Sequence, residues 1–112
     1  LKLSRDRVTN ENAEITFLEP KQPILNYPNR ITAKDFEGWK QEQGLYYPNE
    51  WDKAFTPILS AHDQGETAKD GALLVAKYGK GFYIYTGLSF FRELPEGVPG
   101  AFRLMANMIS VK

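Results

Sequence analysis

The sequence contains no cysteine among its 112 residues and only one histidine. The missing cysteines exclude a disulfide scaffold, a cysteine-ligated zinc site and a cysteine nucleophile. A catalytic zinc takes about three protein ligands, which a single imidazole does not supply. We therefore expect no bound metal and no cofactor. The compartment stays open, because a cysteine-free domain is stable in either redox environment.

Long apolar runs and net charge are missing as well. No stretch approaches the about 20 apolar residues of a membrane-spanning helix, so we expect no membrane insertion. Lys and Arg number 14, and Asp and Glu also number 14, which gives a net charge of zero. Because nucleic-acid-binding domains are usually strongly basic, we expect no nucleic-acid partner.

The composition that remains is that of one globular domain, with 42% hydrophobic and 25% charged residues. We expect residues 1–112 to form a single domain, in which the polar stretch Leu1–Asn12 is a loop or a frayed entry. The chain begins at Leu1 without a methionine, and no signal peptide is visible. We therefore expect it to be a segment of a longer protein.

Hydrophobic periodicity and turn residues predict an α/β fold, with a small mixed sheet and flanking helices. The expected strands are Ile15–Leu18, Pro57–Ala61, Leu73–Tyr78 and Phe82–Thr86, and the expected helices are Ala33–Gln43 and Ala101–Ile109.

The strongest local signal is a β-hairpin. The runs Leu73–Tyr78 and Phe82–Thr86 flank the tripeptide Gly79-Lys80-Gly81, whose glycines suit a tight turn. Both runs are almost continuously apolar, which is typical of strands that are covered on both faces.

The first helix has clear end signals. Thr32 is a suitable N-cap with Asp35 three residues later, and Gly44 is a natural stop. Ile31 and Phe36 have the spacing of a hydrophobic staple.

The second helix has an apolar stripe and a polar face. The stripe comprises Ala101, Phe102, Leu104, Met105, Met108 and Ile109, and the opposite face comprises Gly100, Arg103, Asn107 and Ser110.

The one histidine lies in the polar segment His62–Gly71, which we expect to be an exposed loop. His62, Asp63 and Glu66 are weak candidates for general acid-base chemistry there. Loop clusters of this kind are usually solvated, and we expect no catalytic role for the three residues.

Loop aromatics form a more informative set, because aromatic rings stack on sugar faces and also cover domain contacts. The candidate ligand or partner contacts are Tyr46, Tyr47, Trp51, Phe90, Phe91 and Arg92.

Several stretches resemble a known family. Lys77–Leu88, with its Gly-Lys-Gly turn, followed by the helix Ala101–Ile109, resembles the closing segment of class I glutamine-amidotransferase-like domains, particularly the trehalose-utilisation (ThuA-like) branch. Ile31–Trp39, Leu59–Asp63 and Phe90–Gly100 resemble the C-terminal region of some bacterial PIG-L (LmbE-like) deacetylases.

The resemblance implies part of a flavodoxin-like, amidotransferase-type layered fold behind a zinc-dependent N-acetylsugar deacetylase domain. The amidotransferase nucleophile is a cysteine, which this chain lacks, so no catalytic residue is carried over. The implied partners are the rest of the parent chain and a carbohydrate, and the implied location is periplasmic or secreted.

Three functions compete at this point. The first is a non-catalytic accessory domain of a bacterial carbohydrate-active hydrolase, which supports substrate contact or domain packing. The second is a structural or oligomerisation module, which would bury an apolar patch through Trp51 and Phe90–Phe91. The third is a hydrolase that uses His62, Asp63 and Glu66 in a common pocket.

Overall fold

The computed structural model describes residues 2–9, 13–40 and 43–111. Its strands are β1 (Lys2–Val8), β2 (Ile15–Phe17), β3 (Gly44–Glu50), β4 (Phe55–Ala61), β5 (Lys69–Tyr78) and β6 (Gly81–Thr86). One sheet has four strands in the order β2-β4-β5-β6, and a second pairs β1 with β3. Every ladder among the described residues is antiparallel. The predicted α/β class is confirmed, and the flavodoxin-like layering stays a prediction.

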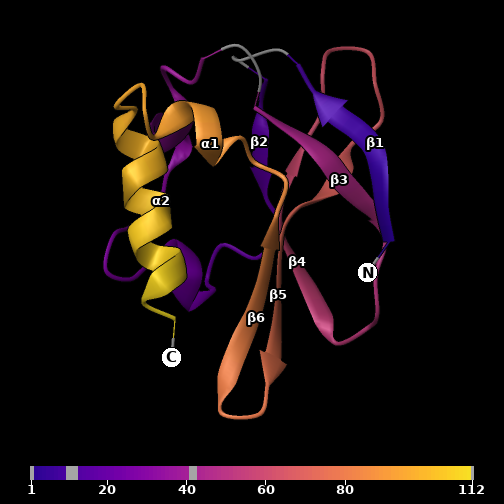
Figure 1. Ribbon diagram of the computed structural model, residues 1–112, viewed down its shortest axis with the longest axis vertical. Helices are drawn as coiled ribbons and strands as arrows, with labels where there is room; N and C mark the ends of the chain where they lie inside the picture. Colours follow the sequence, from indigo (N-terminus) through magenta and orange to yellow (C-terminus); the bar gives the residue numbers. More distant parts are fainter. Residues whose placement is uncertain (1, 10–12, 41–42, 112) are drawn as a thin grey trace.

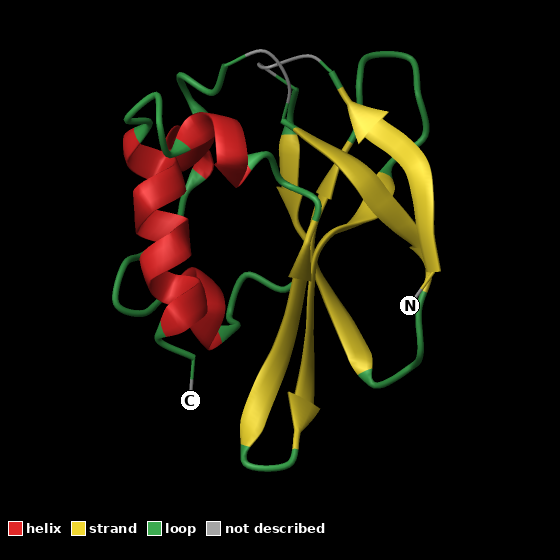
Figure 2. Ribbon diagram, in the orientation of Figure 1, coloured by secondary structure: helices red, strands yellow, loops and turns green. Residues whose placement is uncertain are grey.

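Four helical segments complete the fold. They are the 3₁₀ turns η1 (Pro23–Leu25) and η2 (Ala33–Phe36) and the α-helices α1 (Phe90–Glu93) and α2 (Pro99–Ile109). The helices lie on one side of the four-stranded sheet and the β1–β3 ribbon lies on the other (Figures 1 and 2). α2 contacts η1 and η2, and β3 contacts β5.

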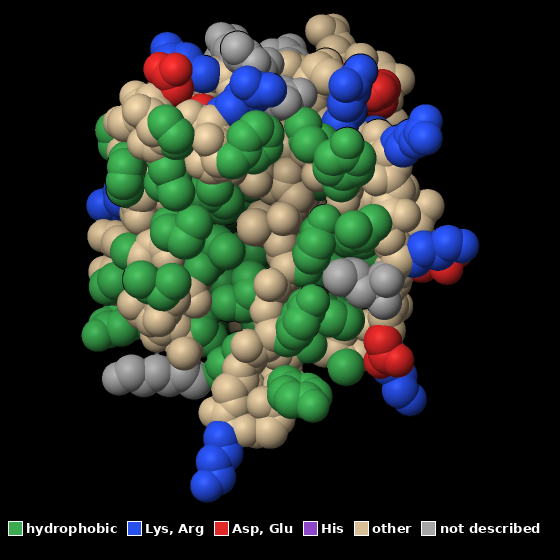
Figure 3. All heavy atoms as spheres, in the orientation of Figure 1, with side chains coloured by type: hydrophobic (Ala, Val, Ile, Leu, Met, Phe, Trp, Pro, Cys, Tyr) green, Lys and Arg blue, Asp and Glu red, His purple; other side chains and the backbone are tan. Residues whose placement is uncertain are grey.

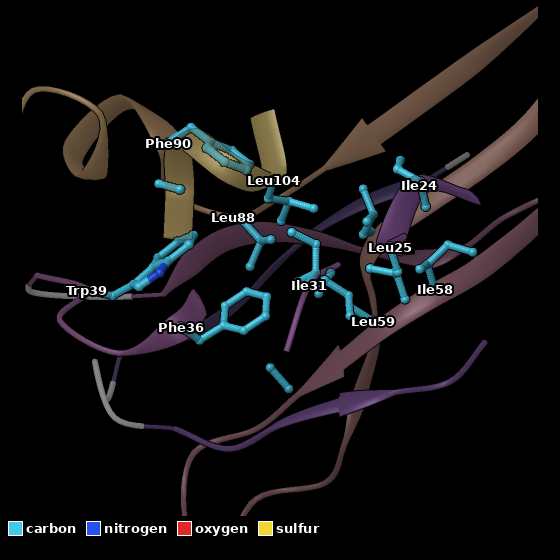
Figure 4. Close-up of a cluster of buried hydrophobic side chains, with 14 of the residues drawn as sticks. Ile24, Leu25, Ile31, Phe36, Trp39, Ile58, Leu59, Leu88, Phe90 and Leu104 are labelled. Carbon is cyan, nitrogen blue, oxygen red and sulfur yellow. The ribbon is translucent and has the colours of Figure 1, made fainter. Parts of the chain in front are cut away.

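The main core fills the space between the helices and the central sheet (Figure 4). Three aromatic rings form one end of it: Trp39 lies 5.5 Å from Phe36 and 5.9 Å from Phe90, measured between ring centroids. Aliphatic side chains from several elements close the rest of it, namely Ile24, Leu25, Ile31, Ile58, Leu59, Leu88 and Leu104.

The β5–β6 hairpin is confirmed, with Gly79 in the left-handed conformation at φ 58° in the turn. Residues 71–76 of β5 are all buried, as predicted for a strand covered on both faces, whereas Lys77 and Tyr78 at its end are exposed. For β6 that prediction is wrong, because Phe82 and Tyr83 are 36% and 53% exposed. β6 is an edge strand of its sheet, and its end near the turn extends beyond the covering elements (Figure 1).

The predicted helix Ala33–Gln43 is wrong, because only the 3₁₀ turn η2 forms within it; its residues 41–42 lie outside the described part. The cap itself is present, since Asp35 Oδ2 accepts a hydrogen bond from the Thr32 backbone N–H at 2.9 Å. Glu37 is extended and Gly38 adopts φ 79°, which ends the turn. Trp39 Nε1 then donates to the Asp35 carbonyl at 2.9 Å, and the Trp39 ring is buried against Phe90 in the core instead of continuing a helix.

The predicted N-terminal loop is also wrong over most of its length, because residues 2–8 form β1; residues 10–12 lie outside the described part. β1 pairs with β3, more than thirty-five residues further along the chain. A strand that depends on so distant a partner leaves little local signal. The polar segment after β4 is likewise shorter than expected, since Lys69 and Asp70 belong to β5.

The buried face of α2 differs from the predicted one. Gly100 and Asn107, expected on the polar face, are buried, whereas Phe102 and Ile109 of the apolar stripe are 51% and 80% exposed. Polar contacts explain this orientation: Asn107 Nδ2 donates to the carbonyls of Ile24 at 2.8 Å and Asn29 at 2.6 Å. α2 therefore packs on η1 and η2 through a face that mixes small, apolar and polar residues.

Candidate functional site

An open cleft lies where β1, β3 and α1 meet. Its volume is about 800 Å³, and it is lined by Arg5, Arg7, Leu45, Tyr46 and Arg92. We call it the Arg–Tyr cleft. It combines three guanidinium groups with one aromatic and one aliphatic side chain, drawn from three elements that are far apart in the sequence.

β1 supplies two of the three arginines. Arg5 and Arg7 are separated by one residue, and both side chains line the cleft. Arg7 stands opposite Leu45 in the ladder with β3, which brings the arginines beside the Leu45–Tyr46 segment. Ser4 Oγ also donates to the Tyr47 carbonyl at 2.5 Å, so side-chain bonding reinforces the ladder.

Tyr46 has the most unusual backbone in the cleft. Its φ is 55°, the only positive value among the described non-glycine residues. The left-handed region is uncommon for a bulky side chain and costs of the order of 1–2 kcal/mol. Tyr85 donates its hydroxyl to the Tyr46 carbonyl at 2.9 Å, which helps to hold this conformation. The Tyr46 side chain remains 57% exposed at the cleft.

Three arginines line the cleft. Among the described residues, Arg5 and Arg7 have no carboxylate at ion-pair distance. Arg92 lies over the Phe91 ring, with 5.2 Å from its guanidinium carbon to the ring centroid. The described lining of this cleft thus contains three arginines and no acidic residue.

A smaller cleft of about 370 Å³ lies on the other side of the same arginines, and Asp63 and Glu66 line it. Both carboxylates already have partners. Asp63 Oδ2 accepts hydrogen bonds from the Thr9 backbone N–H and Oγ1, each at 3.0 Å. Glu66 pairs with Lys69 at 3.7 Å.

The acid-base candidates do not converge into one constellation. His62 is not among the residues that line the smaller cleft, and its Nδ1 lies 2.9 Å from the Asp63 backbone oxygen. Within the described ranges, no group of three or more His, Cys, Asp or Glu side chains is placed to hold a metal ion.

The structure brings together two of the predicted contact residues, Tyr46 and Arg92. Phe91 is exposed beside Arg92, and half-buried Trp51 lines a separate cleft of about 240 Å³. Tyr47 and Phe90 are core residues with 0% and 7% exposure, which leaves them out of a ligand's reach.

Sequence reasoning missed Arg5 and Arg7, because they fell within the presumed N-terminal loop. The available signal was their alternation: residues two apart on a strand point to the same side. That signal becomes useful only once the segment is known to be a strand.

Comparison with protein-family models, with curated proteins and with solved structures finds no match for this chain. The resemblance to amidotransferase-like domains therefore stays a prediction. In the described part of the chain, no helix has both the length and the apolar character needed to cross a membrane.

Proposed function

We propose that this chain is a non-catalytic accessory domain of a carbohydrate-active hydrolase, and that it contacts carbohydrate through the Arg–Tyr cleft. The observation that carries the proposal is the exposed Tyr46 side chain, held in a left-handed conformation beside three arginines. The deacetylase context comes from the sequence resemblance alone.

The chemistry of the cleft suits a sugar. An aromatic ring offers a flat apolar surface to the C–H groups of a pyranose, and Tyr46 presents such a ring at low entropic cost. Guanidinium groups carry up to five N–H donors each, which suits ligands rich in oxygen acceptors. The cleft is also open, so an internal unit of a longer chain has room to lie across it.

A hydrolase at His62, Asp63 and Glu66 has less support. General acid-base catalysis requires groups within reach of one reacting atom. Asp63 accepts hydrogen bonds from Thr9, and Glu66 forms an ion pair with Lys69. His62 does not line the cleft that these two carboxylates share.

The structural-module alternative rests on a different surface. Hydrophobic side chains gather over α2 and β6 on one face of the molecule (Figure 3). Exposed apolar residues of these elements include Phe102 and Ile109 on α2 and Tyr83 on β6. Large apolar patches often mark domain contacts, so this face favours packing against another domain. It is a different surface from the patch expected through Trp51 and Phe90.

Calorimetric titration with a tetrasaccharide of N-acetylglucosamine tests the carbohydrate proposal. We expect saturable binding by the wild type and an affinity loss of about tenfold or more in Tyr46→Ala, because the stacking surface is removed. Tyr78→Ala is the matched control, since Tyr78 is 80% exposed beside the hairpin turn and outside the cleft. No binding, or equal losses in both variants, would contradict the proposal.

A further inference from the structure

We infer that the Arg–Tyr cleft selects an acidic sugar unit, whose carboxylate is held by Arg5 and Arg7 while its ring lies against Tyr46. This inference rests on the proposed function, and it adds the charge of the ligand. It also assigns a binding role to β1, the segment that the sequence did not identify as a strand.

Arg5 and Arg7 are exposed residues of β1. Two ion pairs occur elsewhere on the molecule: Arg103 Nε on α2 lies 2.7 Å from Asp35 Oδ1, and Lys69 pairs with Glu66. Arg5 and Arg7 have no such partner among the described residues, although Asp63 and Glu66 share a neighbouring cleft with them. Both residues are exposed, so their guanidinium groups are accessible to a ligand.

The two arginines lie close enough together to bind one ligand. Arg5 and Arg7 are separated by one residue in a part of β1 where the ladder with β3 shifts register, so their Cα atoms lie at most about 7 Å apart. Long guanidinium side chains at that separation can converge on one carboxylate, or each can bind a separate one. Arginine binds carboxylates bidentately, and such charge-assisted bonds are stronger than those to neutral hydroxyls.

The apolar side chains of the cleft favour an acidic sugar over a bare anion. The same cleft includes the Tyr46 and Leu45 side chains, which offer apolar surface that a small inorganic anion does not use. A uronic acid presents both required surfaces, a carboxylate and the C–H groups of its ring. The combination of charged and apolar walls therefore favours a sugar that carries a carboxylate.

The test compares two tetrasaccharides by calorimetry on the full chain at low salt. One alternates glucuronate with N-acetylglucosamine, and the other is N-acetylglucosamine alone. We expect the acidic chain to bind about tenfold more tightly or better, with an advantage that shrinks as salt screens the charges. The double variant Arg5→Gln/Arg7→Gln removes the advantage, so that the acidic and the neutral chain bind it equally, whereas Arg30→Gln, which contacts α2, keeps the wild-type advantage.

The other possible results contradict either the acidic selectivity, the proposed function or the role of Tyr46. Equal affinities for the two chains overturn the acidic selectivity and leave the proposed function standing. No binding of either chain overturns both. Sulfate or acetate that binds as tightly as the acidic tetrasaccharide shows a simple anion site and overturns the role of Tyr46 in sugar selection.

Discussion

At the scale of single residues, Tyr47 shows how tightly the ribbon is joined to the rest of the molecule. Its side chain is fully buried, and its ring fills space left by two glycines. A Cβ atom at Gly87 would lie 2.3 Å from the ring, and one at Gly44 would lie 2.5 Å from the hydroxyl. Within the described residues, that hydroxyl has no hydrogen-bond partner.

Replacing Tyr47 with phenylalanine should therefore stabilise the protein. The substitution keeps the ring and removes a buried polar group whose desolvation is uncompensated. We expect the free energy of unfolding to rise by about 1 kcal/mol in urea titrations at pH 7. Tyr85→Phe is the contrasting variant, because the Tyr85 hydroxyl donates a bond to Tyr46, and we expect it to be neutral or destabilising. A loss of stability in Tyr47→Phe would contradict the description of this site.

The same hydroxyl makes stability depend on alkaline pH. Burial, and secondly the negative charge of Asp63, raise the pKa of Tyr47 well above its usual 10.0. Above about pH 10 the unfolded chain loses this proton while the folded protein keeps it, so stability is fully present below pH 10 and falls as pH rises further. The fall is about 1.4 kcal/mol per pH unit until the folded group ionises.

Comparing Tyr47→Phe with the wild type isolates that contribution. Burial also raises the pKa of Tyr85, but this effect is common to both proteins. Thermal unfolding between pH 9 and 11 should therefore show a shallower decline in the variant. Parallel declines would show that Tyr47 ionises equally in the folded and unfolded states.

At the scale of elements, the orientation of α2 is the clearest departure from sequence expectation. The Asn107 side chain makes four hydrogen bonds to η1 and the segment that follows it, including the acceptance of the Asn29 backbone N–H at 2.9 Å. Asn107→Ala should cost about 2–3 kcal/mol, whereas Phe102→Ala should cost less than about 1 kcal/mol. A larger loss of unfolding free energy in Phe102→Ala than in Asn107→Ala, measured by urea titration, would indicate that α2 buries its apolar stripe instead.

The packing of α2 on η2 also depends on Gly100. A Cβ atom there would lie 1.5 Å from the carbonyl oxygen of Asp35, so the helix would have to move away. We expect Gly100→Ala to cost at least about 2 kcal/mol of unfolding free energy. In Gly81→Ala, the added Cβ meets nothing closer than 3.9 Å, and stability should change by less than about 0.5 kcal/mol. Equal effects of the two substitutions would refute this contact.

These elements also show which parts of the fold the sequence reveals. The β5–β6 hairpin and the extent of α2 follow from local patterns, namely a glycine turn between apolar runs and a helical period. β1 depends on a distant partner, so no local pattern specifies it. For η2 the Thr32–Asp35 cap specifies the start, and the early end at Glu37 and Gly38 is the part that the sequence pattern does not predict. The buried face of α2 depends on the carbonyls that Asn107 reaches, and polarity alone places that residue outside.

The candidate site also has a part that the sequence predicts and a part that depends on distant strand pairing. Tyr46 and Arg92 were identified from residue type, since aromatic and charged loop residues are typical of contact surfaces. Their meeting in one cleft, and the addition of Arg5 and Arg7, depend on the pairing of β1 with β3. Tyr47 and Phe90 share the residue type of their neighbours, and only the fold shows that they face the core.

At the scale of the whole molecule, the two sides of the central sheet have different roles. The helical side holds the aromatic core and the polar contacts that orient α2 (Figure 4). The β1–β3 ribbon on the other side meets α1 to form the Arg–Tyr cleft. The exposed apolar surface over α2 and β6 is a further feature of the molecule (Figure 3).

The most direct test of this account is an amide NMR titration of the full chain with the glucuronate-containing tetrasaccharide. The account predicts saturable shifts confined to residues 5–7, Leu45, Tyr46 and Arg92, with the hairpin turn and α2 unchanged. Saturable shifts centred on α2 and β6, or on His62–Glu66, or a spectrum that the sugar leaves unperturbed, would contradict it.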